Sequence, residues 1–136
     1  MTIFKDKLDL TTSKRLEIID ITSKVQNTIT NSEIANGIVN IYSKHSTSAI
    51  VINENEQGLL VDFEIFLKEI VPQNNNYKHD IIDNNADSHI RSLLLQSSET
   101  IPFRDKKLAI GTWQSIFFIE LDGPRRRNVQ LTIIGE

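Results

Sequence analysis

Hydrophobic residues between positions 59 and 71 recur at steps of three and four residues, the spacing of one face of an α-helix. Pro72 follows directly and is expected to end this helix. The same spacing recurs over residues 86–94 and, more briefly, over residues 22–35, where a following Asn-Gly pair is a typical stop. The pattern therefore predicts two to three helices.

The other hydrophobic stretches are short, rich in β-branched and aromatic residues, and bounded by turn-forming residues, as strands are. They cover residues 38–42, 48–52, 100–103, 108–110, 113–121 and 128–134. Two earlier runs, residues 3–10 and 16–22, flank a turn-like segment and predict a β-hairpin. Because the helices fall between groups of strands without a steady βαβ rhythm, we expect an α+β fold with a mainly antiparallel sheet, in a single domain that spans residues 1–136.

The composition narrows the classes of function. The 136 residues are 39% hydrophobic, enough for a core that needs no cross-link to stabilise it. There is no cysteine to form a disulfide or a thiolate metal site. A tight metal site must then use nitrogen and oxygen ligands. Without an apolar run of about 18 residues or a signal-peptide pattern, we expect a cytoplasmic protein with no membrane partner. The net charge of −3 argues against nucleic-acid binding, which needs many positive charges.

Three histidines are the strongest candidates for chemistry. His45 follows the strand predicted at 38–42, whereas His79 and His89 lie in the acidic stretch at 78–89. Neutral imidazole is a common metal ligand, and three protein ligands with one open position are typical of catalytic zinc sites. The alternative is that each histidine is a surface or hydrogen-bonded structural residue, and the spacing alone favours that reading.

Two carboxylates are candidates for a supporting role. Asp80 either orients an imidazole or acts as an ordinary loop or capping residue. Glu54 ends an apolar strand, a position from which a carboxylate can reach a cleft and act as general base. The alternative for Glu54 is an acid at the start of a helix, where it faces the helix dipole.

A run of three arginines at 125–127 is the one basic cluster. If the following strand begins that early, Arg125 and Arg127 share one side and suit a phosphate or sulfate; the alternative is solvated surface charge. We expect the only tryptophan, Trp113, in the core, with a binding role beside Thr112 and Gln114 as the alternative.

Several motifs follow one another in order along the chain. They are His45-Ser46-Thr47-Ser48-Ala49, Ile52-Asn53-Glu54, Tyr77-Lys78-His79-Asp80, Asn85-Ala86-Asp87-Ser88-His89, Ile101-Pro102, Gly111-Thr112-Trp113-Gln114 and Glu120-Leu121-Asp122-Gly123-Pro124-Arg125-Arg126-Arg127. In this order they resemble the YjbQ-like family of small proteins, whose members are described as uncharacterised or as secondary thiamine-phosphate synthases. The resemblance extends over nearly the whole chain.

The resemblance implies a compact α+β subunit, assembly as a homotrimer, and a divalent metal, usually zinc, beside an anion pocket. Carried over by motif, the implied metal ligands are His45, His79 and His89, and the implied site carboxylates are Glu54 and Asp80. The residues implied to hold an anionic substrate are Thr112, Gln114, Arg125 and Arg127.

The chain departs from the family pattern at three positions. Asn84 stands where relatives often have Asp, which puts any role of an acid there in doubt. Gln96 and Lys106 stand where relatives often have glycine; both fall in predicted loops, so we expect them to alter mainly the surface shape.

Three functions remain open at this level. The resemblance implies a transferase that joins a pyrimidine diphosphate to a thiazole phosphate with loss of pyrophosphate, whose charge a metal and Arg125 and Arg127 would stabilise. A second is a metal-dependent hydrolase or transferase of another small phosphorylated molecule, with Glu54 as base. A third is a trimeric metal- or anion-binding protein without a reaction.

Overall fold

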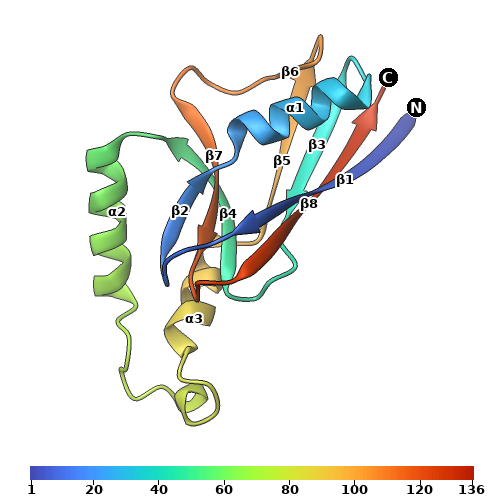
Figure 1. The fold of residues 1–136 in the computed structure, drawn as a ribbon. Helices are drawn as coiled ribbons and strands as arrows, with labels where there is room; N and C mark the ends of the chain where they lie inside the picture. Colours follow the sequence, from blue (N-terminus) through green and yellow to red (C-terminus); the bar gives the residue numbers. More distant parts are fainter.

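The computed structural model describes residues 1–136 and contains eight strands, three α-helices and one short 3-10 helix (Figure 1). The elements are β1 (Thr2–Thr11), β2 (Glu17–Asp20), α1 (Thr22–Ser32), β3 (Gly37–Tyr42), β4 (Ser48–Glu54), α2 (Gln57–Ile70), η1 (Lys78–Ile81), α3 (Ala86–Leu95), β5 (Ser98–Arg104), β6 (Lys107–Leu108), β7 (Gln114–Glu120) and β8 (Arg126–Gly135). The α+β class with antiparallel sheets is confirmed. None of the helices has the length and apolar character that crossing a membrane requires.

The strands form two sheets in which every pairing is antiparallel. One sheet has the order β1-β8-β3-β5-β6 and the other the order β2-β7-β4. The predicted hairpin between the first two strands is wrong, because β1 pairs with β8 and β2 with β7. Leu10 and Leu16, on either side of the expected turn, are buried in different hydrophobic clusters, so the chain changes sheets there.

β7 is the middle of the molecule, because it is buried on both faces. Ile116 and Phe118 join the larger cluster, between the two sheets and α1, whereas Phe117 and Ile119 join the smaller one under α2. Successive side chains of a strand point to opposite faces. The unbroken apolar run of this strand therefore serves two cores.

The helix α2 has the predicted position, but apolar residues lie on its outer as well as its inner side, among four charged ones. Its N-terminus is capped by Glu56, whose carboxylate accepts the N–H groups of Gly58 and Leu59. Leu67 is its one buried residue, and Figure 1 shows the helix standing along the edge of the smaller sheet. The side chains on its outer surface include Val61, Ile65, Phe66 and Ile70, all about half exposed. The apolar residues of a surface helix normally face a core, so the exposed ones on α2 depart from that pattern.

The helix α3 is also predicted correctly, but its burial is the reverse of its hydrophobic pattern. Leu93 and Leu94 are 72% and 60% exposed. The buried side is polar: Ser88 Oγ donates to the carbonyl of Leu121, and Ser92 Oγ donates to the carbonyl of Ser48. A buried polar group is tolerated when it is hydrogen-bonded, so α3 docks by specific bonds rather than by apolar contact.

Gln96 and Lys106, the two positions at which the resemblance leads us to expect glycine, both have a positive φ. Gln96, which follows α3, has φ 78° and ψ 163°, a region that is essentially restricted to glycine. Lys106 has φ 64° and follows Asp105, with φ 50°, in the tight turn between β5 and β6. A residue other than glycine at either position therefore strains the backbone as well as altering the surface shape.

We expect Gln96→Gly to raise the free energy of unfolding by about 1 kcal/mol, because relief of a strain of about 1–3 kcal/mol exceeds glycine's extra entropy cost of about 0.5–1 kcal/mol. Lys106→Gly should act in the same direction. The measurement is urea-induced unfolding followed by circular dichroism. Gln73→Gly, at an exposed loop residue without a positive φ, is the matched control and should lose stability. A Gln96→Gly protein less stable than the wild type would contradict the strain.

Candidate functional site

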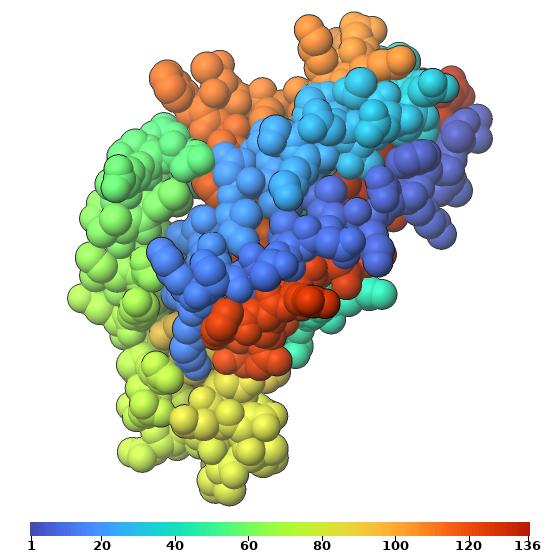
Figure 2. Space-filling model, in the orientation of Figure 1, coloured from blue at the N-terminus to red at the C-terminus, as the bar shows by residue number.

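Four segments meet at the end of the molecule that carries α3. They are the β3–β4 connection at residues 43–47, η1, the start of α3, and the β7–β8 turn at residues 121–125. The space-filling view shows η1 and α3 projecting at the lower end of this face (Figure 2). All three histidines lie on these segments, and each is partly buried.

His79 and His89 are in direct contact. Their ring centroids are 4.8 Å apart and the rings are nearly perpendicular, at 80°. His79 Nε2 lies 3.1 Å from Asn85 Oδ1, and Asn85 Nδ2 donates to Asp122 Oδ2 at 2.9 Å. Because the amide oxygen can only accept, Nε2 of His79 carries a proton, and in the neutral ring Nδ1 is left as the free lone pair.

His45 shares a cavity with His89. The two residues line one cavity of about 350 Å³, together with Ser46, Ser92 and Gln96 among others. His45 Nε2 accepts the backbone N–H of Asn128 at 3.1 Å, which places the proton of the neutral ring on Nδ1. Burial, followed by the nearby charge of Arg127, lowers the pKa of His45, so its neutral, ligand-competent form is favoured.

Each of the three imidazoles is a suitable ligand for a divalent ion, but the three together do not form a ligand set in this structure. Two imidazoles on one tetrahedral ion have ring centres about 5 Å apart, because each nitrogen lies about 2 Å from the ion, and the His79–His89 spacing matches. No group of three histidine or acidic side chains is arranged to hold a metal ion. In addition, the Nε2 lone pair of His45 already accepts the Asn128 N–H.

Asp80 holds the start of α3 in place. Its Oδ1 accepts the N–H of Ala86 at 2.9 Å, so it acts as a cap from outside the helix. Asn85 occupies the N-cap position itself but makes no capping bond with its side chain. Asn84 has φ 53°, a left-handed conformation that Asn and Asp tolerate better than most residues, so this position serves the turn. Asp80 thus positions His89 through the helix.

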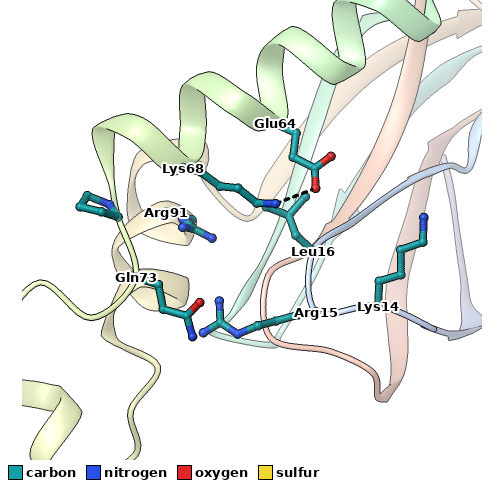
Figure 3. Close-up of a pocket in the computed structure, with 8 residues that line it drawn as sticks. Lys14, Arg15, Leu16, Glu64, Lys68, Gln73 and Arg91 are labelled. Atoms are coloured by element: carbon teal, nitrogen blue, oxygen red, sulfur yellow. Dashed lines mark ion pairs between the residues drawn. The ribbon is translucent and has the colours of Figure 1, made fainter.

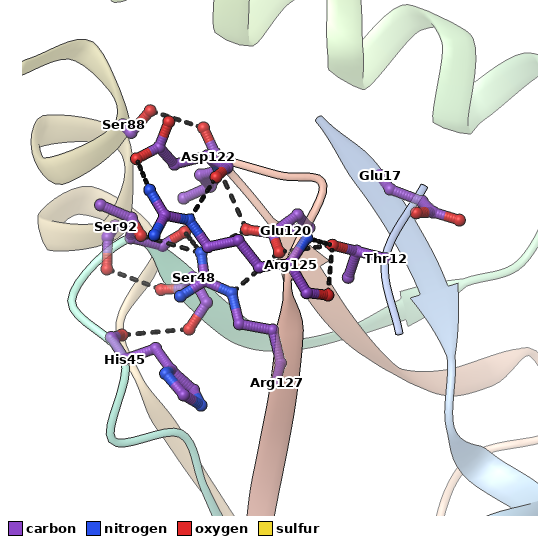
Figure 4. Close-up of polar contacts among 12 residues, drawn as sticks. Thr12, Glu17, His45, Ser48, Ser88, Ser92, Glu120, Asp122, Arg125 and Arg127 are labelled. Atoms are coloured by element: carbon purple, nitrogen blue, oxygen red, sulfur yellow. Dashed lines mark hydrogen bonds and ion pairs between the residues drawn. The ribbon is translucent and has the colours of Figure 1, made fainter. Parts of the chain in front are cut away.

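Arg125 and Arg127 do not share one side of a strand. That arrangement required the last strand to begin at Arg125, and β8 begins at Arg126. Arg125 precedes β8 and is half exposed; its Nε donates to the Asp122 carbonyl at 2.7 Å and its Nη2 lies 2.9 Å from Asp122 Oδ2. Arg127 is buried on the inner side of β8 and forms an ion pair with Glu120 (Figure 4). Its Nη2 also donates to Thr47 Oγ1 at 2.9 Å. An anion that bound Arg127 would compete with these partners.

Glu120 was not a candidate from the sequence, yet its carboxylate is hydrogen-bonded to three other residues of the region. It is fully buried and accepts bonds from Arg127, from Thr12 Oγ at 2.8 Å and from the Asp122 N–H at 3.1 Å. Burial alone would raise the pKa of Glu120, but these bonds outweigh it and hold the pKa below its usual value. The sequence signal was an acid at an inward position of a core strand.

The remaining predicted residues lie at the opposite end of the smaller sheet. Glu54 is paired with Gln114 in the β4–β7 register, whereas Ser48 is paired with Glu120 next to the histidine region. Six residues of extended strand separate the two ends by about 20 Å. Thr112 lies in the loop just before β7. Glu54, Thr112 and Gln114 are therefore not brought to the histidines within one chain.

The expectation that Trp113 belongs to the core is wrong. Its side chain is 73% exposed, beside Thr112 and Gln114. The core under α2 is already filled by Phe117 and Ile119 of β7, so the loop before this strand is left at the surface.

The comparison with known proteins finds one matching family model, UPF0047 protein YjbQ-like, over residues 6–136. A UPF0047 protein of Methanothermobacter thermautotrophicus is 52% identical over 136 residues, which cover all of this chain and 95% of the relative. UPF0047 protein YugU of Bacillus subtilis is 33% identical, with 94% of this chain and 97% of the relative covered.

Solved structures match just as completely. A protein of Sulfolobus solfataricus, described as YbjQ-like and of unknown function, superposes with a TM-score of 0.96 at 40% identity and covers 99% of both chains. A hypothetical protein of Aeropyrum pernix superposes with a TM-score of 0.94 at 34% identity, covering 98% of this chain and 99% of its own.

We expect Glu120→Gln to lower the free energy of unfolding by about 3–5 kcal/mol, the usual cost of leaving a buried charge, here Arg127, without its partner. The depressed pKa of Glu120 gives stability that is present above the unfolded value of about 4.3 and is lost as the pH falls through the lower folded value. The wild type should therefore lose more stability in acid than the variant does.

Urea unfolding at a series of pH values measures both effects. Glu69→Gln, at an exposed residue of α2, removes the same charge without a buried partner and should change stability by less than about 0.5 kcal/mol. Equal losses in the two variants would show that the Glu120–Arg127 pair has no special role.

Proposed function

Because this chain belongs to the UPF0047 YjbQ-like family, whose conserved fold it shares, we propose that its histidine cleft binds a divalent metal, zinc by preference, and acts on a small phosphorylated molecule. One observation carries the proposal: His89 contacts His79 and lines the same cavity as His45. No other part of the chain gathers groups of this chemistry, since these are its only histidines.

His45, His79 and His89 are the proposed ligands. The neutral state of His45 and the free Nδ1 of His79 favour binding, because metal ligands must be unprotonated. Binding through Nε2 of His45 would replace its bond from the Asn128 N–H. When bound, a divalent ion supplies a Lewis acid for a phosphoryl oxygen.

The anion is proposed to bind at the edge of the cleft formed by Arg125. This guanidinium is oriented by Asp122, the residue that also accepts a bond from Asn85, the partner of His79. Nε and Nη2 of Arg125 make these contacts, and its other N–H groups face solvent, where a phosphate can reach them. Arg127, paired behind it with Glu120, holds the β8 end rigid beside His45.

The reaction we propose to test is the transfer described for the family, in which a thiazole nitrogen attacks the methylene carbon of a pyrimidine diphosphate and pyrophosphate leaves. The leaving group carries several negative charges, so a cation at the cleft edge stabilises its departure. Hydrolysis with Glu54 as base has less support, because Glu54 is about 20 Å along the sheet from the histidine end.

We further propose that the chain assembles as a homotrimer through the outer surfaces of α2 and α3. The support is the exposed apolar side chains of these helices, including Ile65, Phe66, Leu93 and Leu94. Exposed patches of this kind mark interaction sites in soluble proteins. Glu54, Thr112 and Gln114 could contact a histidine cleft only if that cleft belonged to a second copy of the chain.

The first test is the metal content of the purified protein and of His89→Ala. We expect about one divalent ion per chain in the wild type after zinc is supplied, and at least a tenfold loss of zinc affinity in His89→Ala, because His89 is the imidazole shared by both contacts. Elemental analysis and zinc titration measure this. The same proteins are assayed for thiamine phosphate formed from the two phosphorylated precursors.

Lys44→Ala is the control, since Lys44 lines the same cavity without supplying a ligand atom. It should keep the metal. A wild type that takes up no zinc, or a His89→Ala protein that binds it unchanged, would remove the metal site. Metal binding without product from the two precursors would leave the metal and reject the transfer reaction.

The second test is the oligomeric state of Phe66→Glu. Phe66 is 57% exposed on α2, so a charge there should not disturb the core but should prevent apolar association. By analytical ultracentrifugation we expect the wild type at three times the 15.5 kDa chain mass and Phe66→Glu as a folded monomer. Lys24→Glu, at an exposed residue of α1, should remain trimeric. A wild-type monomer at all concentrations would refute the assembly.

A further inference from the structure

A pocket on a different side of α3 from the histidine cleft gathers positive charge. It has a volume of about 420 Å³, and four of its eight lining residues are cationic: Lys14, Arg15, Lys68 and Arg91. Figure 3 shows Arg15, Lys68 and Arg91 around one opening, from the β1–β2 connection, α2 and α3. His89 is two residues from Arg91, about 200° around the helix, so the two sites use different faces of α3.

Arg91 forms the buried wall of this pocket. Its side chain is only 3% exposed, and Nε and Nη2 donate to the Val71 carbonyl at 3.1 and 2.8 Å. Nη1 lies 3.4 Å from Asp87 Oδ2. The guanidinium is therefore already fixed, and a ligand that contacts it does not have to immobilise a flexible side chain.

Arg15 is held in the same way but faces solvent. Its Nη1 and Nη2 donate to the two oxygens of Asp87 at 2.8 and 3.0 Å, which uses two of the five N–H groups of the guanidinium. The side chain is 32% exposed, so its other N–H groups are accessible from the pocket. A fork oriented by a buried carboxylate is suited to a second, planar or tetrahedral anion.

The pocket is not neutralised by its own acids. Asp87 serves two arginines, and Glu64, the one acid of the lining, lies 3.3 Å from Lys68. The lining residues together with Asp87 thus count four cations against two carboxylates, an excess of two positive charges in a chain whose net charge is −3; Asp80 and Asp122 act on Arg15 from outside the lining. Positive charge confined to a concave site attracts anions.

We propose that this pocket binds the phosphate group of a small phosphorylated molecule, at a site separate from the histidine cleft. Arginine forks match phosphate oxygens, and lysines add charge. The volume lies within the range of about 300–1,000 Å³ that is usual for small-ligand sites and leaves room for an organic part. The polar lining, which includes Gln73, favours a hydrophilic one. The site needs no metal.

The test is isothermal titration with inorganic phosphate, glycerol phosphate and glycerol at a constant ionic strength of about 0.15 M. We expect glycerol phosphate to bind more tightly than inorganic phosphate, and glycerol not to bind. In Lys14→Gln/Lys68→Gln, which leaves the Arg15–Asp87–Arg91 cluster intact, the Kd for glycerol phosphate should rise at least tenfold. Lys24→Gln/Lys107→Gln removes the same charge from exposed positions elsewhere and should leave the Kd unchanged.

Metal-free His89→Ala should bind glycerol phosphate as the wild type does, which separates this site from the proposed function of the histidine cleft. Absence of saturable binding, or equal weakening in the two double-lysine variants, would overturn the proposal. Inorganic phosphate binding as tightly as glycerol phosphate would overturn the assignment to an organic phosphate. Loss of binding in His89→Ala would place the phosphate in the histidine cleft instead.

Discussion

The ion pair between Glu120 and Arg127 is the contact on which the histidine end of the molecule depends. It lies inside the protein, where β7 of one sheet and β8 of the other converge, and a charge there is tolerated only while it is paired and hydrogen-bonded. Through Thr12 and Thr47 it also holds the end of β1 and the loop that carries His45. The site is thus built on the seam between the two sheets.

Because the buried side of α3 is polar, this one short helix can contribute residues to two polar sites. Its serines bond to the ends of β4 and β7, Asp87 and Arg91 face the cationic pocket, and His89 faces the histidine cleft. If α3 packed through apolar residues, the positions of its serines, Asp87 and Arg91 would not be available for these polar contacts. The cost is that Leu93 and Leu94 point outward, which a single chain leaves unburied.

The same consideration applies to α2, whose apolar outer side has no counterpart in the chain. The smaller core needs only the side of the helix that carries Leu67. The outer residues, with Phe66 among them, would gain from burial only against something outside this chain, since burying apolar surface is worth about 25 cal/mol per Å². The fold therefore leaves apolar surface uncovered on both helices that lie next to the smaller sheet.

The pattern of hydrophobic residues by itself determined the three helices, most strands and the α+β class, because these depend on local periodicity. The identity and order of the residues determined the motifs of the family. Only the tertiary structure decided that β1 and β2 belong to different sheets, since pairing depends on distant strands. It also decided that Trp113 is exposed, and that the polar side of α3 is the buried one. Burial of a polar side chain depends on partners far away in sequence, such as Leu121 for Ser88, and no local pattern records them.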